Sequence, residues 1–183
     1  MEHRLKPVDA PYSDNIAALL KHYPKIDGYL LNLFKVFANS ERFLSHSGPK
    51  NLLDQDSPLS LRDREIIILR CCAKLHCEYE WGIHVTVFAE HAQLSELHIY
   101  GLYHGTGEED CWSHQESGLI QAVDQLIETS RIDHHKHPDF ITHWDTQQQL
   151  EIFALVANYH LVAFVANNAE LEGEAFGAKF PTP

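Results

Sequence analysis

The sequence has few basic residues. Its 183 residues include 14 Lys and Arg against 26 Asp and Glu, so the formal net charge is −12 with the histidines neutral. A protein that binds nucleic acid needs a basic surface to displace phosphate counterions, and anionic lipid also attracts basic segments. We therefore expect neither nucleic acid nor a membrane as a partner of this chain.

Long apolar segments are also lacking. Residues 1–10 contain no hydrophobic segment of the secretory-signal type. The most apolar run, Leu150–Ala166, has 17 residues, includes Glu151 and His160, and is shorter than the roughly 20 residues that span a bilayer. Because this run is apolar nearly all round, we expect a helix at the centre of the molecule or at a subunit interface. We expect the protein to be cytoplasmic.

Cysteine is scarce, and several catalytic motifs are missing. The four cysteines, Cys71, Cys72, Cys77 and Cys111, are too few for a disulfide-rich scaffold, so each is a small buried residue or a reactive thiol. The glycine-rich nucleotide loops, the G-x-S-x-G elbow and the H-E-x-x-H zinc helix do not occur. The loop 133–138 holds three histidines but lacks the spacing of a dedicated metal site. We therefore expect no cofactor and no metal ion.

The spacing of apolar residues is helical along most of the chain. No segment alternates with period two between hairpin turns, so a sheet has no support. Helix-start signals occur at Ser13, Ser60, Ser95, Ser113 to Glu116 and Thr146 to Gln149. The principal expected helices are Tyr29–Leu44, Leu61–Ala73, Glu78–Glu90 and Leu150–Ala166. The sequence predicts an all-α, single-domain helical bundle over residues 1–183, with six to eight helices and no linker.

An unusual set of side chains opens the expected helix at Glu78. If Cys77 begins this helix, Cys77, Glu80 and His84 lie on one face. Glu80 and His84 are four residues apart and close enough to share a proton or a hydrogen bond. A helix N-terminus favours the thiolate form of a cysteine such as Cys77. We expect Trp81 to exclude water from this cluster, together with Phe88, and so to shift its pKa values.

Simpler interpretations remain open for the same residues. An exposed pair at this spacing is common on helix surfaces, so Glu80 and His84 need not be functional. Cys77 is equally compatible with an inert buried thiol. Glu65 follows the first turn of its helix, where a negative charge is favourable whatever its function.

The segment 60–100 resembles a known family. It contains Arg64-Glu65, then Cys77 after eleven residues, then Tyr79-Glu80-Trp81 and His84. This pattern is similar to the carboxymuconolactone decarboxylase family, whose members include the alkylhydroperoxidase D proteins. The resemblance implies the helical fold of that family and a homo-oligomer, a trimer or hexamer. It also implies that Glu65, Cys77, Glu80 and His84 are catalytic.

Two branches of the family differ in chemistry. In the alkylhydroperoxidase D branch a Cys-x-x-Cys pair precedes the histidine, and here Glu80 occupies the position of the second cysteine. A two-cysteine disulfide cycle within the motif is therefore impossible. The decarboxylase branch carries Glu-x-x-x-His, which Glu80 and His84 match, although the rest of that branch's pattern is not visible.

These observations leave three hypotheses. The first is acid–base chemistry on a small-molecule substrate, namely decarboxylation or lactone processing, by Glu80 and His84 with Glu65 orienting the histidine. The second is a one-cysteine thiol peroxidase, an antioxidant of peroxiredoxin-like activity, in which Cys77 reduces a hydroperoxide. The third is a non-catalytic oligomeric protein that keeps the family fold.

Overall fold

The computed structural model describes residues 5–46 and 56–182, which form nine helices and no β-strand. The helices are Asp14–Leu20 (α1), Asn32–Phe37 (α2), Glu41–His46 (α3), Leu61–Lys74 (α4), Glu78–Phe88 (α5), Glu96–His104 (α6), His114–Thr129 (α7), Pro138–His143 (α8) and Thr146–Asn168 (α9). The prediction of an all-α protein is confirmed. The described helices outnumber the six to eight expected, because α8 lacks a clear sequence signal and one predicted helix is divided in two.

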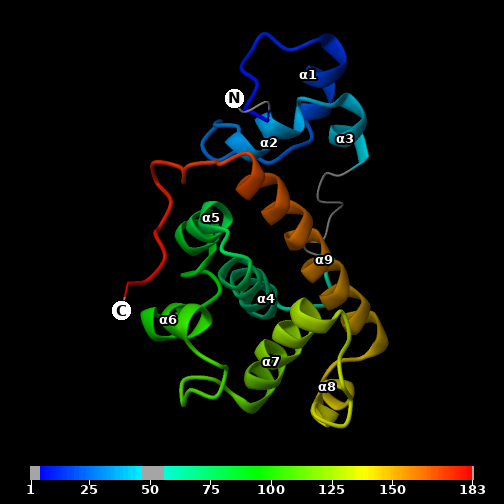
Figure 1. The fold of residues 1–183 in the computed structure, drawn as a ribbon, viewed down its shortest axis with the longest axis vertical. Coiled ribbons are helices and arrows are strands. Elements are labelled where there is room, and N and C mark those ends of the chain that lie inside the picture. The colour runs from blue at the N-terminus through cyan, green and yellow to red at the C-terminus, as the bar shows by residue number, and fades with distance from the viewer. Residues whose placement is uncertain (1–4, 47–55, 183) are drawn as a thin grey trace.

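Helix α4 is the centre of the molecule, and α5, α6, α7 and α9 pack around it (Figure 1). Its predicted cap is confirmed, since the Ser60 hydroxyl accepts a hydrogen bond from the backbone N–H of Asp63 at 3.1 Å. Four consecutive residues, 66–69, are fully buried. Four consecutive residues point to all sides of a helix, so their burial requires other elements around it and places α4 in the core.

A buried ion pair holds α4 against α7. Arg70 of α4 is only 3% exposed, and its guanidinium donates to both carboxylate oxygens of Asp124 at 2.6 Å and to the carbonyl of Leu102 at 2.8 Å. A buried guanidinium requires partners of this kind for its donors. This pairing joins α4, the end of α6 and α7 around one buried charge.

The predicted helix Tyr29–Leu44 is wrong as a single element, because it divides into α2 and α3. The side chain of Asn39 donates to the carbonyl of Val36 at 2.9 Å, and the Ser40 hydroxyl accepts from the N–H of Phe43 at 3.2 Å. Short polar side chains of this kind compete with the helical backbone for its hydrogen bonds. The two bonds end α2 and begin α3.

The longest helix, α9, starts one residue earlier than its predicted capping box implied. Asp145 is the cap: its carboxylate accepts from the N–H of Gln148 at 2.9 Å, and the Gln148 side chain accepts from the N–H of Asp145 at 3.0 Å. The predicted pair, Thr146 and Gln149, has the same chemistry one position later. Asp145 takes the cap because its backbone is extended there.

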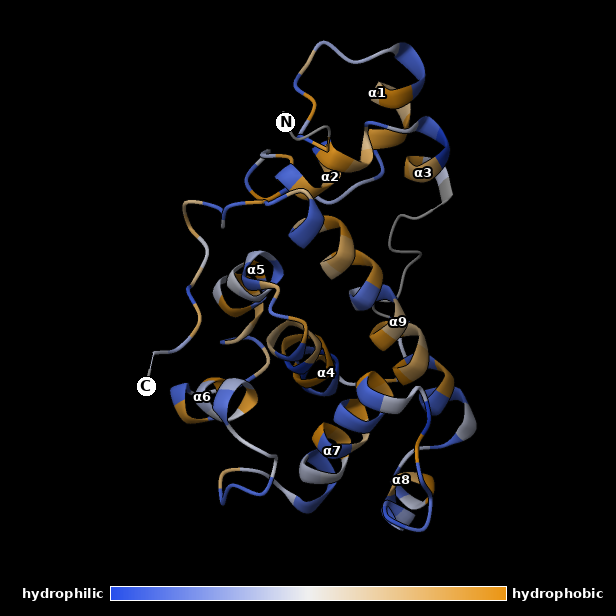
Figure 2. Cartoon of the chain, viewed as in Figure 1, coloured by the Kyte–Doolittle hydropathy of each residue, from blue (hydrophilic) through white to orange (hydrophobic). Residues whose placement is uncertain are grey.

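Only one side of α9 faces the core. Ile152, Leu155 and Tyr159 are buried, whereas Leu150 and Phe164 are 63% and 59% exposed. Figure 2 shows hydrophobic residues along much of this helix. At 23 residues, α9 is long and apolar enough to cross a membrane, judged by length and composition alone. Within its most apolar 18 residues, 39% are buried inside the molecule. This is a weak signal, because the core helix of a soluble protein can meet the same criteria. The helix is thus longer than the apolar run that the sequence suggested.

The C-terminal segment packs along α5 (Figure 1). The N–H of Ala178 donates to the carbonyl of Gly82 at 3.1 Å, and the Thr86 hydroxyl donates to the carbonyl of Phe176 at 3.1 Å. Phe180 lies against Trp81, with ring centroids 5.5 Å apart. One face of α5 is therefore covered by this segment, while the opposite face carries Glu80 and His84.

Candidate active site

Two neighbouring helices bring the predicted acidic and imidazole side chains together. Glu65 lies in the second turn of α4, and Glu80 and His84 lie one turn apart on α5. All three are buried, with exposed fractions of 2%, 6% and 4%. The spacing that placed Glu80 and His84 on one face of a helix is confirmed, and their burial excludes the exposed surface pair.

His84 is held between partners on both ring nitrogens. Its Nδ1 lies 2.8 Å from Oε2 of Glu65, and its Nε2 lies 2.9 Å from the hydroxyl of Tyr159 on α9. Oε2 of Glu80 is 3.8 Å from the same Nε2. Burial lowers the pKa of His84, but the adjacent Glu65 carboxylate, with help from Glu80, outweighs it, so the net shift is upward from 6.5. The imidazolium form is therefore favoured by its setting.

Glu80 has an incomplete set of hydrogen bonds. Its Oε1 is buried and has no hydrogen-bond partner among residues 5–46 and 56–182. Burial raises the pKa of this carboxyl to about 7, although His84 lowers it, and Glu174 raises it further. A carboxyl with a pKa near neutrality is suited to give or take a proton under ordinary conditions.

These groups line an apolar cavity of about 570 Å³. Glu80, His84 and Tyr159 are among its polar lining residues, and the others are His22, Lys25 and Asn158. The hydrophobic wall is formed by residues from α2, α5, α9 and the turn after α1: Leu31, Leu33, Phe34, Phe37, Ile83, Val87, Phe88, Val162, Tyr23, Pro24 and Ile26. A concave apolar site with a few convergent polar groups is the usual form of a small-molecule binding site.

Cys77 does not share this cavity. It caps α5 as predicted, but its side chain is fully buried and is not among the residues that line the cavity. Burial raises the pKa of its thiol to about 12, despite backbone hydrogen bonds from Glu80 and Tyr79 that lower it. The expectation that the helix N-terminus favours the thiolate is therefore wrong, because desolvation outweighs the dipole.

Trp81 also lies elsewhere than expected. Its ring packs against Tyr103 and Phe180, at centroid distances of 5.7 and 5.5 Å, and it does not line the cavity. The expectation that Trp81 excludes water from the cluster is wrong, because its ring packs toward α6 and the C-terminal segment instead of the cavity. The expectation for Phe88 is supported, because its ring centroid is 5.2 Å from that of His84.

Tyr159 was not anticipated as a site residue. In the sequence it occupies an apolar position of a helix, where a tyrosine is most simply interpreted as core. Glu174 was missed as well: Tyr79 donates to it at 2.6 Å, the N–H of Asn32 donates at 3.0 Å, and Tyr29 donates at 3.0 Å. Neither residue has a local sequence signal, because each meets its partners only through tertiary packing.

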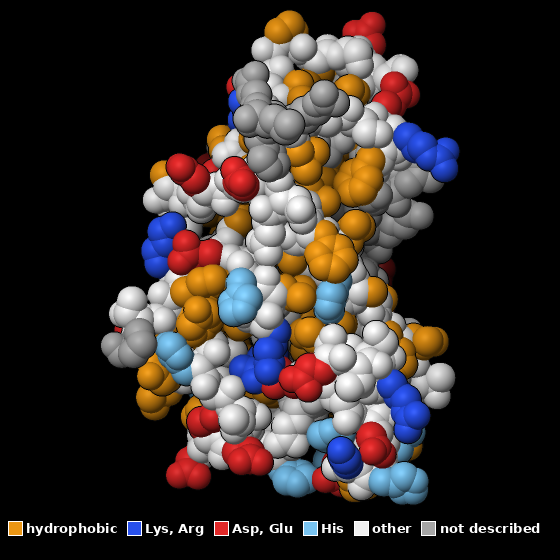
Figure 3. Space-filling view, viewed as in Figure 1, with side chains coloured by type: hydrophobic (Ala, Val, Ile, Leu, Met, Phe, Trp, Pro, Cys, Tyr) orange, Lys and Arg blue, Asp and Glu red, His pale blue; other side chains and the backbone are white. Residues whose placement is uncertain are grey.

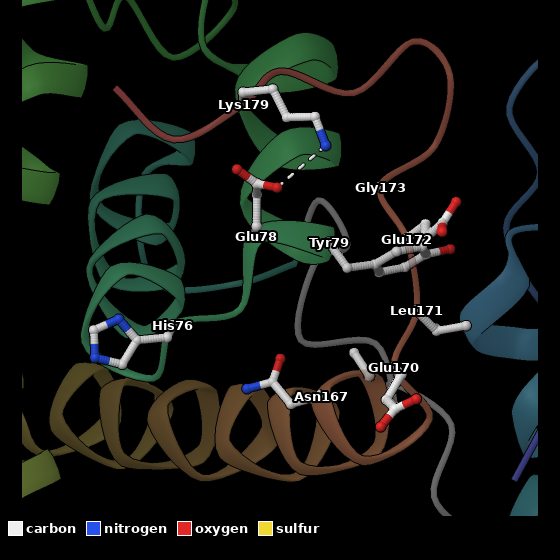
Figure 4. Close-up of a pocket in the computed structure, with 10 residues that line it drawn as sticks. His76, Glu78, Tyr79, Asn167, Glu170, Leu171, Glu172, Gly173 and Lys179 are labelled. Atoms are coloured by element: carbon white, nitrogen blue, oxygen red, sulfur yellow. Dashed lines mark hydrogen bonds and ion pairs between the residues drawn. The ribbon is translucent and has the colours of Figure 1, made fainter. Parts of the chain in front are cut away.

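Other sites in the described part of the chain offer less. No group of three His, Cys, Asp or Glu side chains there is arranged to hold a metal ion, and this includes the histidines of loop 133–138. A second cavity, of about 540 Å³, lies between the start of α5, the end of α9 and the C-terminal segment (Figure 4). Of the acidic residues that line it, Glu78 is paired with Lys179 at 3.1 Å, unlike Glu80 in the first cavity.

No protein-family model matches the sequence, and no curated protein matches it.

Proposed function

We propose that this chain is an acid–base enzyme of the carboxymuconolactone decarboxylase type, in which Glu80 transfers a proton to or from a small substrate beside His84. The observation that carries the proposal is the unpartnered Oε1 of Glu80 at the wall of an apolar cavity. A buried polar atom without a hydrogen bond is costly, and a bound substrate is one way to complete it.

Decarboxylation illustrates the use of these groups. In a substrate whose carboxylate is β to a carbonyl, the bond to the carboxylate breaks, carbon dioxide leaves, and the electron pair moves onto the carbonyl oxygen as an enolate. The protonated Glu80 then gives its proton to the carbon, which restores the carbonyl. Glu80 regains a proton from solvent for the next turnover. Its pKa of about 7 keeps a large fraction protonated near neutral pH.

Glu65 is a positioning residue in this scheme. Its carboxylate accepts from Nδ1 of His84 at 2.8 Å, which fixes the tautomer and the orientation of the ring. The imidazolium that Glu65 favours supplies positive charge beside the developing enolate.

The position of Cys77 counts against the thiol-peroxidase alternative. A peroxidatic cysteine reacts as an accessible thiolate, whereas the Cys77 thiol is fully buried and its pKa is raised to about 12. The non-catalytic alternative does not explain why a buried Glu80 oxygen without a hydrogen-bond partner lies at the wall of a cavity.

The test is a screen of β-keto acids and lactones, with carbon dioxide release and deuterium incorporation from deuterated water as readouts. On any substrate found, we expect Glu80→Gln to lower the rate by about 10²- to 10⁴-fold, because the amide keeps the shape but cannot transfer the proton. Adding His84→Ala should cause little further loss, since members of one catalytic unit are not additive.

Two controls accompany this screen. Glu90→Gln changes an exposed carboxyl two residues beyond α5 and should leave the rate unchanged. Cys77→Ser should retain most of the activity. Circular dichroism shows whether each variant folds. Full activity in a folded Glu80→Gln protein would remove the proposal, and loss of activity in Cys77→Ser together with peroxide consumption by the unaltered chain would favour the peroxidase.

A further inference from the structure

Three helices contribute to a continuous chain of hydrogen bonds at the cavity wall. Glu65 on α4 contacts His84 on α5 at 2.8 Å, and His84 contacts Tyr159 on α9 at 2.9 Å. The three residues are at most 4% exposed. The chain ends at the hydroxyl of Tyr159, and Tyr159 is a lining residue of the cavity.

The protonation of His84 decides what the Tyr159 hydroxyl can do. A neutral imidazole with its proton on Nδ1 accepts at Nε2, so the hydroxyl proton of Tyr159 is directed to the ring. An imidazolium donates from Nε2 to the tyrosine oxygen, and the hydroxyl proton is then available for another acceptor. The Glu65 carboxylate favours the imidazolium. Burial keeps the hydroxyl itself protonated, because it raises the pKa of Tyr159 well above 10.

Within the described chain, the Tyr159 hydroxyl has no hydrogen-bond partner other than His84. It is therefore a buried donor with nothing in these residues to receive its proton when His84 is charged. Glu80 approaches the same ring nitrogen, with Oε2 3.8 Å from Nε2. A proton-transfer group and a hydrogen-bond donor thus converge on one point of the cavity.

We propose that Tyr159 is a catalytic residue that donates a hydrogen bond to the carbonyl oxygen of the substrate and stabilises it as an enolate, and that the substrate is a ring-bearing carbonyl compound. This inference rests on the proposed acid–base function and adds to it the group that receives the negative charge. Donors aimed at a developing oxyanion in a dry site contribute strongly to catalysis. The apolar, partly aromatic wall and the volume of about 570 Å³ suit a small ring system.

A phenol tests this assignment without turnover, because it presents an oxygen on a planar carbon as an enolate does. The probe is 2-naphthol, and its reference is 2-methylnaphthalene, which has the same shape and no hydrogen-bonding oxygen. Both are titrated by fluorescence at pH 6.5, where Glu80 is largely uncharged because its pKa is about 7. The unaltered protein should bind 2-naphthol more tightly, even though the methyl compound is the more apolar. Equal or reversed affinities would overturn the inference without any variant.

The variant Tyr159→Phe should then weaken 2-naphthol binding by about 10- to 100-fold and leave 2-methylnaphthalene unchanged, since a hydrogen bond next to a charged group is lost. An equal loss for both ligands would indicate a merely structural role and would also overturn the inference. Tyr103→Phe is the matched control, because Tyr103 is packed on α6 outside the cavity and should keep the preference.

Different experimental results would contradict the proposed function and this inference. Glu80→Gln should keep the preference for 2-naphthol, because the donor is intact. If that preference is present but Glu80→Gln retains full activity, the proton-transfer role of Glu80 is wrong and Tyr159 remains a recognition group. If Glu80→Gln abolishes activity but Tyr159→Phe binds both probes normally, the assignment of Tyr159 is wrong and the acid–base function stands.

Discussion

At the scale of single residues, Glu80 and His84 couple stability to pH in the same direction. The folded chain holds the Glu80 proton to a pKa of about 7 instead of the ordinary 4.5. Between these values the folded state binds more protons than the unfolded chain, so stability falls as pH rises. His84 has a pKa above 6.5 in the folded chain, so its contribution is full below 6.5 and is lost as pH rises through the folded value.

We therefore predict that the free energy of unfolding decreases by about 1 kcal/mol or more between pH 6 and pH 8.5. Glu80→Gln should remove most of this slope, whereas Glu90→Gln, at an exposed position, should keep it. Urea denaturation at several pH values provides the measurement. A slope that is the same in Glu80→Gln and the unaltered chain would contradict the prediction.

Cysteine reactivity is the second residue-scale prediction. Cys71, Cys72 and Cys77 are buried, and burial raises the pKa of each thiol, whereas Cys111 is only partly buried. We expect iodoacetamide at pH 7.5 to label Cys111 well before the other three in the folded protein, because reaction requires an accessible thiolate. Mass spectrometry of peptides reports the order. Rapid labelling of Cys77 would contradict its burial and favour the one-cysteine peroxidase.

At the scale of elements, two glycines test how the C-terminal segment packs on α5. A Cβ added at Gly82 would lie 2.5 Å from the backbone oxygen of Ala178, whereas a Cβ at Gly118 in α7 would meet nothing within 4 Å. We predict that Gly118→Ala stabilises the protein by about 0.5–1 kcal/mol through helix propensity. Gly82→Ala should gain nothing or destabilise, because the backbone of the segment must move.

Thermal unfolding and limited proteolysis measure these outcomes. Proteolysis should remove the segment after Glu174 faster in Gly82→Ala than in Gly118→Ala, because Ala178 and its bond to the Gly82 carbonyl are displaced. Equal stabilisation by both substitutions, with unchanged proteolysis, would show that the segment does not pack closely on α5 in solution.

At the scale of the whole molecule, the exposed side of α9 bears on assembly. Leu150, Phe153 and Phe164 are exposed along one helix, and Figure 3 shows apolar side chains distributed over the face that α9 crosses in Figure 1. Exposed apolar surface of this kind often marks an interaction site. We propose that the chain is a homo-oligomer that buries this side of α9.

Light scattering coupled to size exclusion tests this proposal. The unaltered chain should elute with a mass several times 21.0 kDa. The double substitution Phe153→Gln and Phe164→Gln should reduce that mass, while Leu97→Gln, a change at an exposed apolar residue of α6, should not. A monomeric mass for the unaltered chain and for both variants would show that the exposed side of α9 does not mediate assembly, and would contradict the proposal.

The sequence by itself determined the helical class, most helix starts and the pairing of Glu80 with His84. These features depend on neighbours within a few residues: Ser60 finds its backbone partner three positions away, and one helical turn separates Glu80 from His84. Where local signals competed, sequence was not enough, as when Asn39 and Ser40 divided a predicted helix.

Only the tertiary structure decided which of the candidate residues share a site. The sequence motif contains Cys77 and Trp81 beside Glu80, yet packing buries both away from the cavity. Tyr159 joins His84 from 75 positions along the chain, and no local pattern distinguishes it from a core tyrosine. The pKa shifts follow the same division, because the number of polar atoms and the depth of burial around a group arise from elements that are distant in sequence. The desolvation that raises the pKa of Glu80 toward neutrality, and that of Cys77 far above it, therefore has no signature in the sequence alone.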